Sequence, residues 1–333
     1  MTDAPLAITV TAFGAPDQLE LRPHDPGPPK AGEVRIAVEI AGIGYVDVLV
    51  GKGAYQLKPD LPFVLGSECA GRVEAVGEGV DQALVGKRVC GAGFIGAFGQ
   101  AVNFPARAVT ELPPSMSFEE ASVFRVSYGT AYHALVQRGR LQPGETLLVL
   151  GAGGAIGVAA IQIGKALGAH VIASASSAEK RALALAAGAD AAIDALAPEW
   201  REAVKAANGG RPVDVVVDPV GGGATEPAFR SLGWNGRLLV IGFAGGGIAR
   251  LPVNLALLKG ASLVGVDVRQ FGEHEPDVQA ANMRALFALH AEGRLRPPIA
   301  RVYPLADYVE ALRAAFSGQV AGRILLRMRP DPA

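Results

Sequence analysis

The chain has very little cysteine, with only Cys69 and Cys90 among its 333 residues. Two cysteines are too few for a disulfide framework, and they exclude a four-cysteine zinc site. The N-terminal stretch MTDAPLAITV has neither the basic residues nor the long apolar core of a secretory signal. We therefore expect a cytoplasmic protein in a reducing compartment.

The chain also lacks an excess of charge, because 31 basic and 32 acidic side chains leave a formal net charge of -1. A protein that grips nucleic acid phosphates or anionic lipid carries a positive excess. We therefore expect no nucleic-acid partner and no membrane partner, but a small molecule or another protein. Aromatic residues are few, at 6%, whereas the 43 glycines indicate many tight turns.

The length and the pattern of apolar runs predict two domains. From residue 6 to 109, short apolar runs broken by Gly and Pro are typical of a β-rich domain. Six later runs alternate with helical or loop-length segments, which predicts a parallel sheet with helices on both faces. These runs are TLLVLG, AHVIAS, AAI, PVDVVVD, RLLVIG and ASLVGVDV.

The segments that join and close these domains carry their own signals. Ser117 and Glu120 form a possible capping box at the start of a connecting helix, and Gly139 stands where that helix would end. The tail predicts a short extended run, a helix at 305–316 and a final strand that completes the first domain. We therefore assign 1–121 and 269–333 to the first domain and 122–268 to the second.

The stretch TLLVLGAGGAIGVAAIQIGKALGAHVIASA, residues 146–175, raises the question of a membrane helix, because no charge lies between Glu145 and Lys165. Four glycines would stand in the middle of such a helix, and no second spanning stretch follows. The apolar period also changes, from the strand-like LLVL to a helical spacing. We therefore interpret the stretch as strand, glycine turn, helix and strand, with the helix starting near Ala155 and ending at Gly168.

The start of that helix is a predicted pyrophosphate site, because unpaired N–H groups and the positive end of the helix dipole favour an anion there. The literal G-x-G-x-x-G pattern is absent, and a tight turn alone could explain the glycines. Inside a complete βαβ unit they indicate dinucleotide binding. The predicted contacts in this turn are Gly151, Gly154, Ala155, Ile156 and Gly157.

The end of the next strand favours NADPH over NADH. An NAD site has an acidic residue there, but this strand ends VIASASSAEKR, with neutral Ser174 at the expected position. Ser176, Ser177 and Lys180 offer hydroxyl donors and a positive charge to a 2′-phosphate. The alternative is a capped helix start with solvated charges, which is the interpretation we favour for Arg181.

Several motifs together resemble the zinc-free quinone oxidoreductase (zeta-crystallin-like) branch of the medium-chain dehydrogenase/reductase superfamily. The resemblance implies an α/β protein with a GroES-like β-rich catalytic domain and a Rossmann doubly wound domain, with the active site between them. It also implies a homodimer that pairs the edge strand near 262–267. The motifs are GSECAGRVEAVGEGV, KRVCG, VSYGTAYHAL, LQPGETLLVLGAGGAIGVAAIQIGKALGA, VVVDPVGG, GRLLVIGFAGG and VAGRILL.

The resemblance also bears on metal content. Zinc-dependent relatives carry Cys and His ligands where this chain reads GYVDV, and a His where Ser67 stands. The five histidines have no ligand spacing, so we expect no metal. Without a Lewis acid, the acceptor that fits best is a quinone, or alternatively the C=C bond of an enone, another α,β-unsaturated carbonyl or a thioester.

By resemblance, further residues are expected to contact the cofactor. These are Thr130 near the nicotinamide ribose, Gly242 and Phe243 beside the nicotinamide, Arg323 in the closing tail, and Gly44. Helix packing is the alternative for Thr130, and a surface strand is the alternative for Arg323.

The substrate side departs from the family pattern, because an Asn and a Tyr are missing around Gly44-Tyr45-Val46-Asp47. We predict Tyr45 and Tyr55, with Tyr128 as a third candidate, as residues that line the acceptor pocket, although each could instead pack at a domain interface. Asp47 is expected to support the pocket wall, and water can supply the proton. A rival from another class is a non-catalytic, crystallin-like NADPH-binding protein.

Overall fold

The computed structural model describes residues 4–330 and divides into two compact units. The first unit ends at Val126 and resumes at Pro297, and the second runs from Ser127 to Arg296. The pattern along the chain predicts 269–296 in the first domain, whereas these residues pack with the second unit. The ring of Phe271 stacks on His133 with the ring centroids 3.8 Å apart, and Asn282 exchanges hydrogen bonds with Gln137.

The first unit is β-rich, as the apolar runs predict. Its elements are β1 (Leu6–Val10), η1 (Pro16–Gln18), β2 (Glu20–Pro23), β3 (Glu33–Gly42), α1 (Tyr45–Gly51), β4 (Phe63–Val64), β5 (Glu68–Val76), η2 (Gln82–Leu84), β6 (Arg88–Ala92), β7 (Ala101–Pro105), η3 (Ala106–Ala108), β8 (Val109–Glu111), α2 (Phe118–Ala121), β15 (Ile299–Pro304), η6 (Leu305–Asp307), α11 (Tyr308–Ser317) and β16 (Arg323–Arg327).

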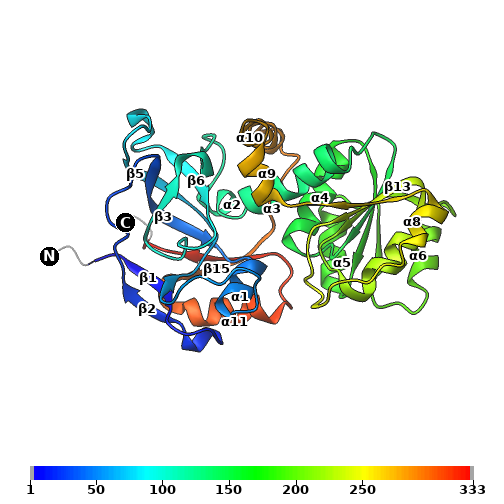
Figure 1. Cartoon of the computed structure of the whole chain (residues 1–333), viewed down its shortest axis with the longest axis horizontal. Coiled ribbons are helices and arrows are strands. Elements are labelled where there is room, and N and C mark those ends of the chain that lie inside the picture. The colour runs from blue at the N-terminus through cyan, green and yellow to red at the C-terminus, as the bar shows by residue number, and fades with distance from the viewer. Residues whose placement is uncertain (1–3, 331–333) are drawn as a thin grey trace. The chain divides into compact units, whose positions relative to one another are not determined.

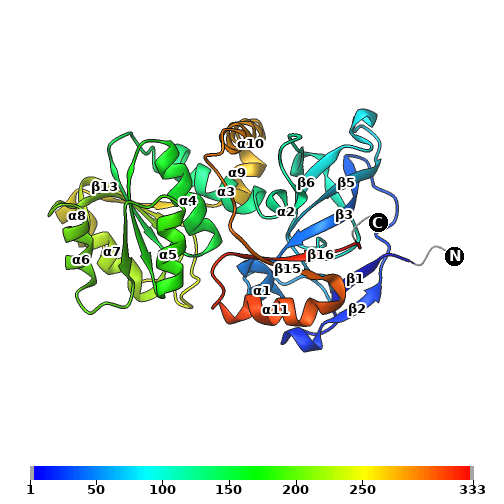
Figure 2. The same ribbon diagram turned by 180° about the vertical axis from the view of Figure 1, so that it is seen from behind.

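Two sheets enclose the core of the first unit. The smaller has the order β2-β1-β4, and the larger has the order β15-β16-β3-β5-β6-β8, with β7 also paired to β3. The tail therefore completes this unit as expected, because β16 pairs antiparallel with β3. α1 and α11 lie side by side (Figures 1 and 2). Fully buried side chains such as Ile36, Val38 and Phe98 fill the core.

The second unit alternates strands and helices. Its elements are α3 (Arg125–Tyr132, which leads in from the first unit), the π-helical η4 (His133–Arg138), β9 (Thr146–Leu150), α4 (Ala155–Ala166), β10 (His170–Ala175), α5 (Ala178–Ala186), β11 (Ala191–Asp194), α6 (Trp200–Ala207), β12 (Val213–Asp218), η5 (Gly222–Ala224), α7 (Thr225–Arg230), β13 (Leu232–Val240), α8 (Asn254–Lys259), β14 (Ser262–Gly265), α9 (Val268–His274) and α10 (Pro276–Ala291).

The six strands of the second unit form one parallel sheet in the order β11-β10-β9-β12-β13-β14. Counted along the chain, this is the 3-2-1-4-5-6 order of a doubly wound dinucleotide-binding sheet. The direction of winding reverses between β9 and β12. Ligands of such sheets bind outside the carboxyl ends of the strands at this reversal.

Alternate side chains of β9 face opposite layers of helices. Leu148 packs in a cluster with Val204 of α6 and Phe229 of α7, whereas Leu147 lies against Gly164 of α4. Right-handed crossovers require this separation, and Figures 1 and 2 show α4 and α5 on one face and α6 and α8 on the other.

Several local predictions are confirmed. The six strand runs appear as β9 to β14, and α4 begins at Ala155. The hydroxyl of Ser117 accepts from the Glu120 N–H, and the Glu120 carboxylate accepts from the Ser117 N–H, which completes the capping box. Within residues 4–330, none of the helices combines the length and hydrophobicity that a bilayer crossing requires.

Candidate functional site

The glycine turn follows β9 directly and begins with a residue in the left-handed region. Gly151 has φ 58° and its carbonyl accepts from the Gly154 N–H at 2.9 Å. A Cβ on Gly157 would lie 2.4 Å from the Gly151 oxygen and 2.7 Å from the Ala152 Cα. Only glycine lets the first turn of α4 pack this closely on the end of β9.

Gly154 is the N-cap of α4, and Ala155 and Ile156 are its first two residues. Gly154 is exposed and the next two residues are half-buried. α4 is 12 residues long, so its first N–H groups and its dipole concentrate positive potential at this end. The arrangement suits a pyrophosphate that bridges the switch point of the sheet.

Lys180, in the first turn of α5, lies against this glycine turn. A Cβ on Gly153 would come within 2.5 Å of the Lys180 Cβ and 2.6 Å of its Cγ. The aliphatic part of the lysine therefore occupies the space that any other residue at 153 would fill. The structure brings a cation and the predicted pyrophosphate turn together.

The serines before α5 differ in their surroundings. Ser176 is exposed, and Ser177 caps α5 by accepting from the Lys180 N–H at 3.3 Å. Ser174 is only 2% exposed, and its hydroxyl accepts from the Trp200 indole N–H at 2.9 Å. The Ser174 side chain therefore links α6 to the sheet.

Arg181, beside Lys180, is engaged within the protein. Its guanidinium donates to the Ala175 carbonyl at 3.2 Å and forms an ion pair with Asp194 at 3.3 Å. Lys180 is thus the better placed of the two cations for a 2′-phosphate.

The loop after β12 is organised by a buried carboxylate that is not among the predicted site residues. Asp218 is 1% exposed and accepts from the Val220 and Gly221 N–H groups at 2.9 and 2.8 Å. It also accepts from the Thr225 hydroxyl at 2.7 Å. The sequence feature that could have indicated this role is an aspartate at the end of a continuous apolar run, directly before PVGGG.

This loop holds Gly242 and Phe243, which follow β13. The Ala244 N–H donates to the Pro219 carbonyl at 3.1 Å. Gly221 has φ 69°, and a Cβ there would lie 2.8 Å from the Phe243 ring. On its other side the β12 loop meets the glycine turn, because a Cβ on Gly151 would lie 3.0 Å from the Val220 side chain. The predicted pyrophosphate and nicotinamide residues of this unit therefore share one edge of the sheet.

Thr130 and Tyr128 lie on α3, and both are buried. The Tyr128 hydroxyl donates to the Gln162 side-chain oxygen at 2.8 Å, and the Gln162 amide donates to the Arg296 carbonyl at 2.9 Å. Tyr128 is only 2% exposed. Its hydroxyl thus links α3 to α4.

In the first unit, Gly44 and Tyr45 begin α1. The Gly44 N–H donates to a carboxylate oxygen of Asp47 at 2.7 Å, and Tyr45 is 48% exposed. Asp47 is 1% exposed, and burial raises its pKa to about 7, although the hydrogen bonds from Gly44 and Ser67 act in the opposite direction. The carboxyl thus fixes the start of α1.

Arg323 forms a buried ion pair with Glu68, and its charge also acts on Asp47. Its guanidinium donates to Glu68 at 2.8 Å, and the side chains are 8% and 3% exposed. The other Glu68 oxygen accepts from the Val126 N–H at 3.2 Å. Burial raises the pKa of Glu68, while Arg323 opposes the rise. Arg323 therefore does not lie on an exposed surface strand, as the alternative interpretation holds, but is buried with its guanidinium on Glu68.

Tyr55 is half-buried and packs its ring 5.7 Å from that of Phe94, centroid to centroid. Tyr45 is therefore the more accessible of the two candidate tyrosines in this unit.

The donor set does not fit a zinc ion. Between residues 4 and 330, no group of three or more His, Cys, Asp and Glu side chains could hold a metal. The carboxyl groups of Asp47 and Glu68 have the Arg323 guanidinium as their neighbour, and this positive charge repels a cation. The two cysteines are buried thiols, and burial raises the pKa of Cys90 to about 11.

Family models and relatives match both units. Residues 30–114 match the alcohol dehydrogenase GroES-like domain, and residues 155–283 match the zinc-binding dehydrogenase family. The chain is 35% identical over 311 residues to quinone oxidoreductase-like protein 2 of Mus musculus, which spans 93% of this chain and 88% of that protein.

Solved structures agree with these matches. Escherichia coli quinone oxidoreductase complexed with NADPH has a TM-score of 0.87 and 28% identity, over 97% of this chain and 99% of that one. CurK enoyl reductase has a TM-score of 0.88 and 26% identity, over 98% of this chain and 99% of that one. From these matches and the doubly wound order of its sheet, the chain belongs to the quinone oxidoreductase branch of the medium-chain dehydrogenase/reductase superfamily, and it is an oxidoreductase.

Proposed function

We propose that this protein is an NADPH-dependent, metal-free reductase that transfers a hydride to a quinone. The observation that carries the proposal is the contact of the Lys180 stem with Gly153, which holds a cation beside the glycine turn. Such a cation can attract the 2′-phosphate, the group that NADPH has and NADH lacks. The NADPH complex of the Escherichia coli relative supports the choice of cofactor.

Each part of the second unit has a role in this proposal. The start of α4 receives the pyrophosphate, while Ser176, Ser177 and Lys180 bind the 2′-phosphate. Gly242 and Phe243 shape the space for the nicotinamide, held there by the loop that Asp218 organises. Bound NADPH supplies the hydride. The protein therefore acts by binding and orientation.

The acceptor side needs no dedicated acid. One NADPH and one proton convert a quinone to a hydroquinone and leave NADP⁺, and water can deliver the proton to the exposed oxygens. Tyr45 is the residue of the first unit that we propose to contact the acceptor, because it is 48% exposed at the start of a helix anchored by Asp47. Gly44, Thr130 and Arg323 are proposed as further cofactor contacts on the resemblance alone.

A second candidate is reduction of a C=C bond next to a carbonyl or thioester. The likeness to CurK enoyl reductase favours it. Both reactions use the same hydride, so the nucleotide site serves either one. A non-catalytic NADPH-binding role would keep the same site without turnover of any acceptor.

NADPH oxidation by the purified protein separates these functions. We would supply an ortho-quinone or a simple enone, each with and without a metal chelator. Rapid turnover of the quinone that resists the chelator is the expected result. Turnover of the enone alone would move the assignment to ene reduction, loss of activity with chelator would disprove the metal-free mechanism, and silence with both acceptors would favour a binding protein.

We further propose that the enzyme works in the cytosol as a homodimer. β14 pairs with β13 alone among the strands that the structure describes, which leaves one edge for a second copy. Exposed apolar side chains surround this edge, as a partner-covered surface would require. They are Trp234, Val253, Leu257, Leu258 and Leu263.

A further inference from the structure

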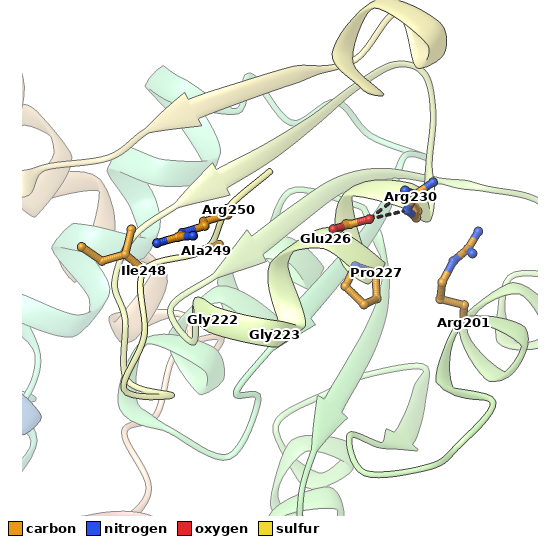
Figure 3. A pocket seen from close by; sticks show the side chains of 9 residues that line it. All are labelled: Arg201, Gly222, Gly223, Glu226, Pro227, Arg230, Ile248, Ala249 and Arg250. Atoms are coloured by element: carbon orange, nitrogen blue, oxygen red, sulfur yellow. Dashed lines mark hydrogen bonds and ion pairs between the residues drawn. The ribbon is translucent and has the colours of Figure 1, made fainter. Parts of the chain in front are cut away.

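A second cationic site lies in the second unit, on the side of α6 and α7. A pocket of about 640 Å³ opens there between α6, α7 and the loop at 248–250 (Figure 3). In Figure 3, Arg201 and Arg230 stand at one end and Arg250 at the other. The pocket is lined by Arg201, Gly222, Gly223, Glu226, Pro227, Arg230, Ile248, Ala249 and Arg250.

A smaller pocket of about 220 Å³ continues this surface, because it shares Arg201 and Arg230 with the first. It adds three cations, Lys205, Arg211 and Lys259. We call the two pockets together the arginine groove. It holds six cationic side chains against Glu202 and Glu226, in a chain whose net charge is only -1.

Most of this positive charge has no internal counterpart. Glu226 already forms an ion pair with Arg230, one helical turn further along α7, at 2.7 Å. Arg201 and Arg250 form no ion pair with any residue in the described part of the chain. Burial lowers the pKa of Lys259, and the charges of Arg201 and Arg230 lower it further. The groove thus carries an unbalanced positive field that an anion would relieve.

The groove is separate from the predicted 2′-phosphate site. Lys180 belongs to α5, on the face of the sheet that α4 and α5 cover. Arg201 belongs to α6 and Arg230 to α7, which pack on the opposite face around Val204 and Phe229. The cations of the groove therefore lie on the other face of the sheet from the lysine proposed to bind the 2′-phosphate.

We propose that the arginine groove binds a small oligophosphate, in which two or more phosphates are linked directly. Guanidinium groups match phosphate oxygens in charge and fork geometry. Cations spread over two connected pockets suit linked phosphates better than a single one. No residue lining either pocket is aromatic, so the groove offers no stacking surface for the bases of a single-stranded nucleic acid.

Titration calorimetry with sodium triphosphate tests the proposal, on protein alone and on protein saturated with NADPH. The test variant is R201Q/R250Q, because both side chains are exposed and unpaired within the described structure, and circular dichroism checks its fold. The matched control is R284Q, an exposed arginine on α10. We expect triphosphate to bind in both conditions and to lose at least 10-fold in affinity in R201Q/R250Q alone.

Further arms identify the ligand chemistry and the site. Inorganic phosphate and fructose 1,6-bisphosphate should bind at least 10-fold more weakly than triphosphate, since neither contains linked phosphates. Equal triphosphate affinity in R201Q/R250Q and the parent protein would overturn the proposal. Loss of binding in K180Q, displacement by NADPH, or no binding at 150 mM salt would overturn it as well. None of these results depends on which acceptor the enzyme reduces.

Discussion

At the scale of single residues, the coenzyme site depends on a missing side chain. Gly153 has no Cβ, and the Lys180 stem fills that space. The lysine is therefore held over the turn before any cofactor arrives, which reduces the side-chain entropy lost on binding. Arg181, next in sequence, forms an ion pair with Asp194 and donates to the Ala175 carbonyl.

We predict that K180Q raises the KM for NADPH by about 10- to 100-fold and leaves the KM for NADH within about twofold, because a charge-assisted phosphate contact contributes roughly 1.5–3 kcal/mol. Steady-state kinetics with both coenzymes measures this. R181Q removes the same charge one position away and should shift the ratio of the two KM values much less. An equal effect on both coenzymes in K180Q would contradict a 2′-phosphate role.

At the scale of secondary-structure elements, one buried cluster joins three segments that are far apart in sequence. Asp47 lies on α1, Glu68 begins β5 and Arg323 begins β16. The Arg323 guanidinium acts on both carboxyl groups here, and Asp47 also accepts hydrogen bonds from Ser67 and the Gly44 N–H. A proton on Asp47 relieves the excess of negative charge in this cluster.

This cluster makes stability depend on pH with a defined sign. Folding raises the pKa of Asp47 from 3.8 to about 7, so between these values the folded protein holds a proton that the unfolded chain has released. Asp47 therefore favours folding less as the pH rises from about 4 to about 7, and its effect is constant above this window. The expected loss reaches roughly 4 kcal/mol, at about 1.4 kcal/mol per pK unit.

The variant D47N should remove the part of the fall that Asp47 causes, because its amide oxygen can accept from Gly44 and cannot ionise, and should leave the part that Glu68 causes. Urea unfolding at pH 4 to 8 gives the comparison, with D60N as the control on an exposed carboxyl of the same unit. D60N should keep the slope of the parent protein. Parallel curves for D47N and the parent would show that Asp47 does not titrate in this window.

Local pattern predicted the elements of the second unit, because continuous apolar runs and glycine spacing are properties of neighbouring residues. The Glu68–Arg323 pair spans 255 positions, and no local pattern could relate the two. The motif VVVDPVGG does not reveal the role of Asp218, because that role depends on N–H groups that reach the carboxylate only once the loop has turned. The placement of 269–296 differed because a helical pattern does not reveal which unit a helix packs against.

At the scale of the whole molecule, the edge at β14 and the arginine groove are the two surfaces whose composition calls for a partner. The first is apolar: Leu257 is 82% exposed and Leu263 is 51% exposed. Such side chains cluster where another protein surface covers them. A second copy could place its own β14 beside this edge, so that the sheets of the two second units would form one continuous sheet.

We predict that the parent protein sediments as a dimer and that L257K/L263K sediments as a monomer, because two charges per copy would be buried in the contact. Analytical ultracentrifugation measures both. L196K is the control, since Leu196 is 75% exposed and lies after β11, away from this edge. A dimeric L257K/L263K, or a monomeric parent, would refute assembly through β14.

The chain also contains intrinsic fluorescent probes, because its only two tryptophans lie near the predicted coenzyme site and near the apolar edge at β14. Trp200 is half-buried, and its indole N–H donates to Ser174 on β10, the strand that ends at the predicted ribose site. Trp234 is 77% exposed beside the apolar edge and packs over Gly260. Replacing one indole at a time with phenylalanine would leave a single emitter, so that coenzyme capture and self-association could be followed separately by fluorescence without any added dye.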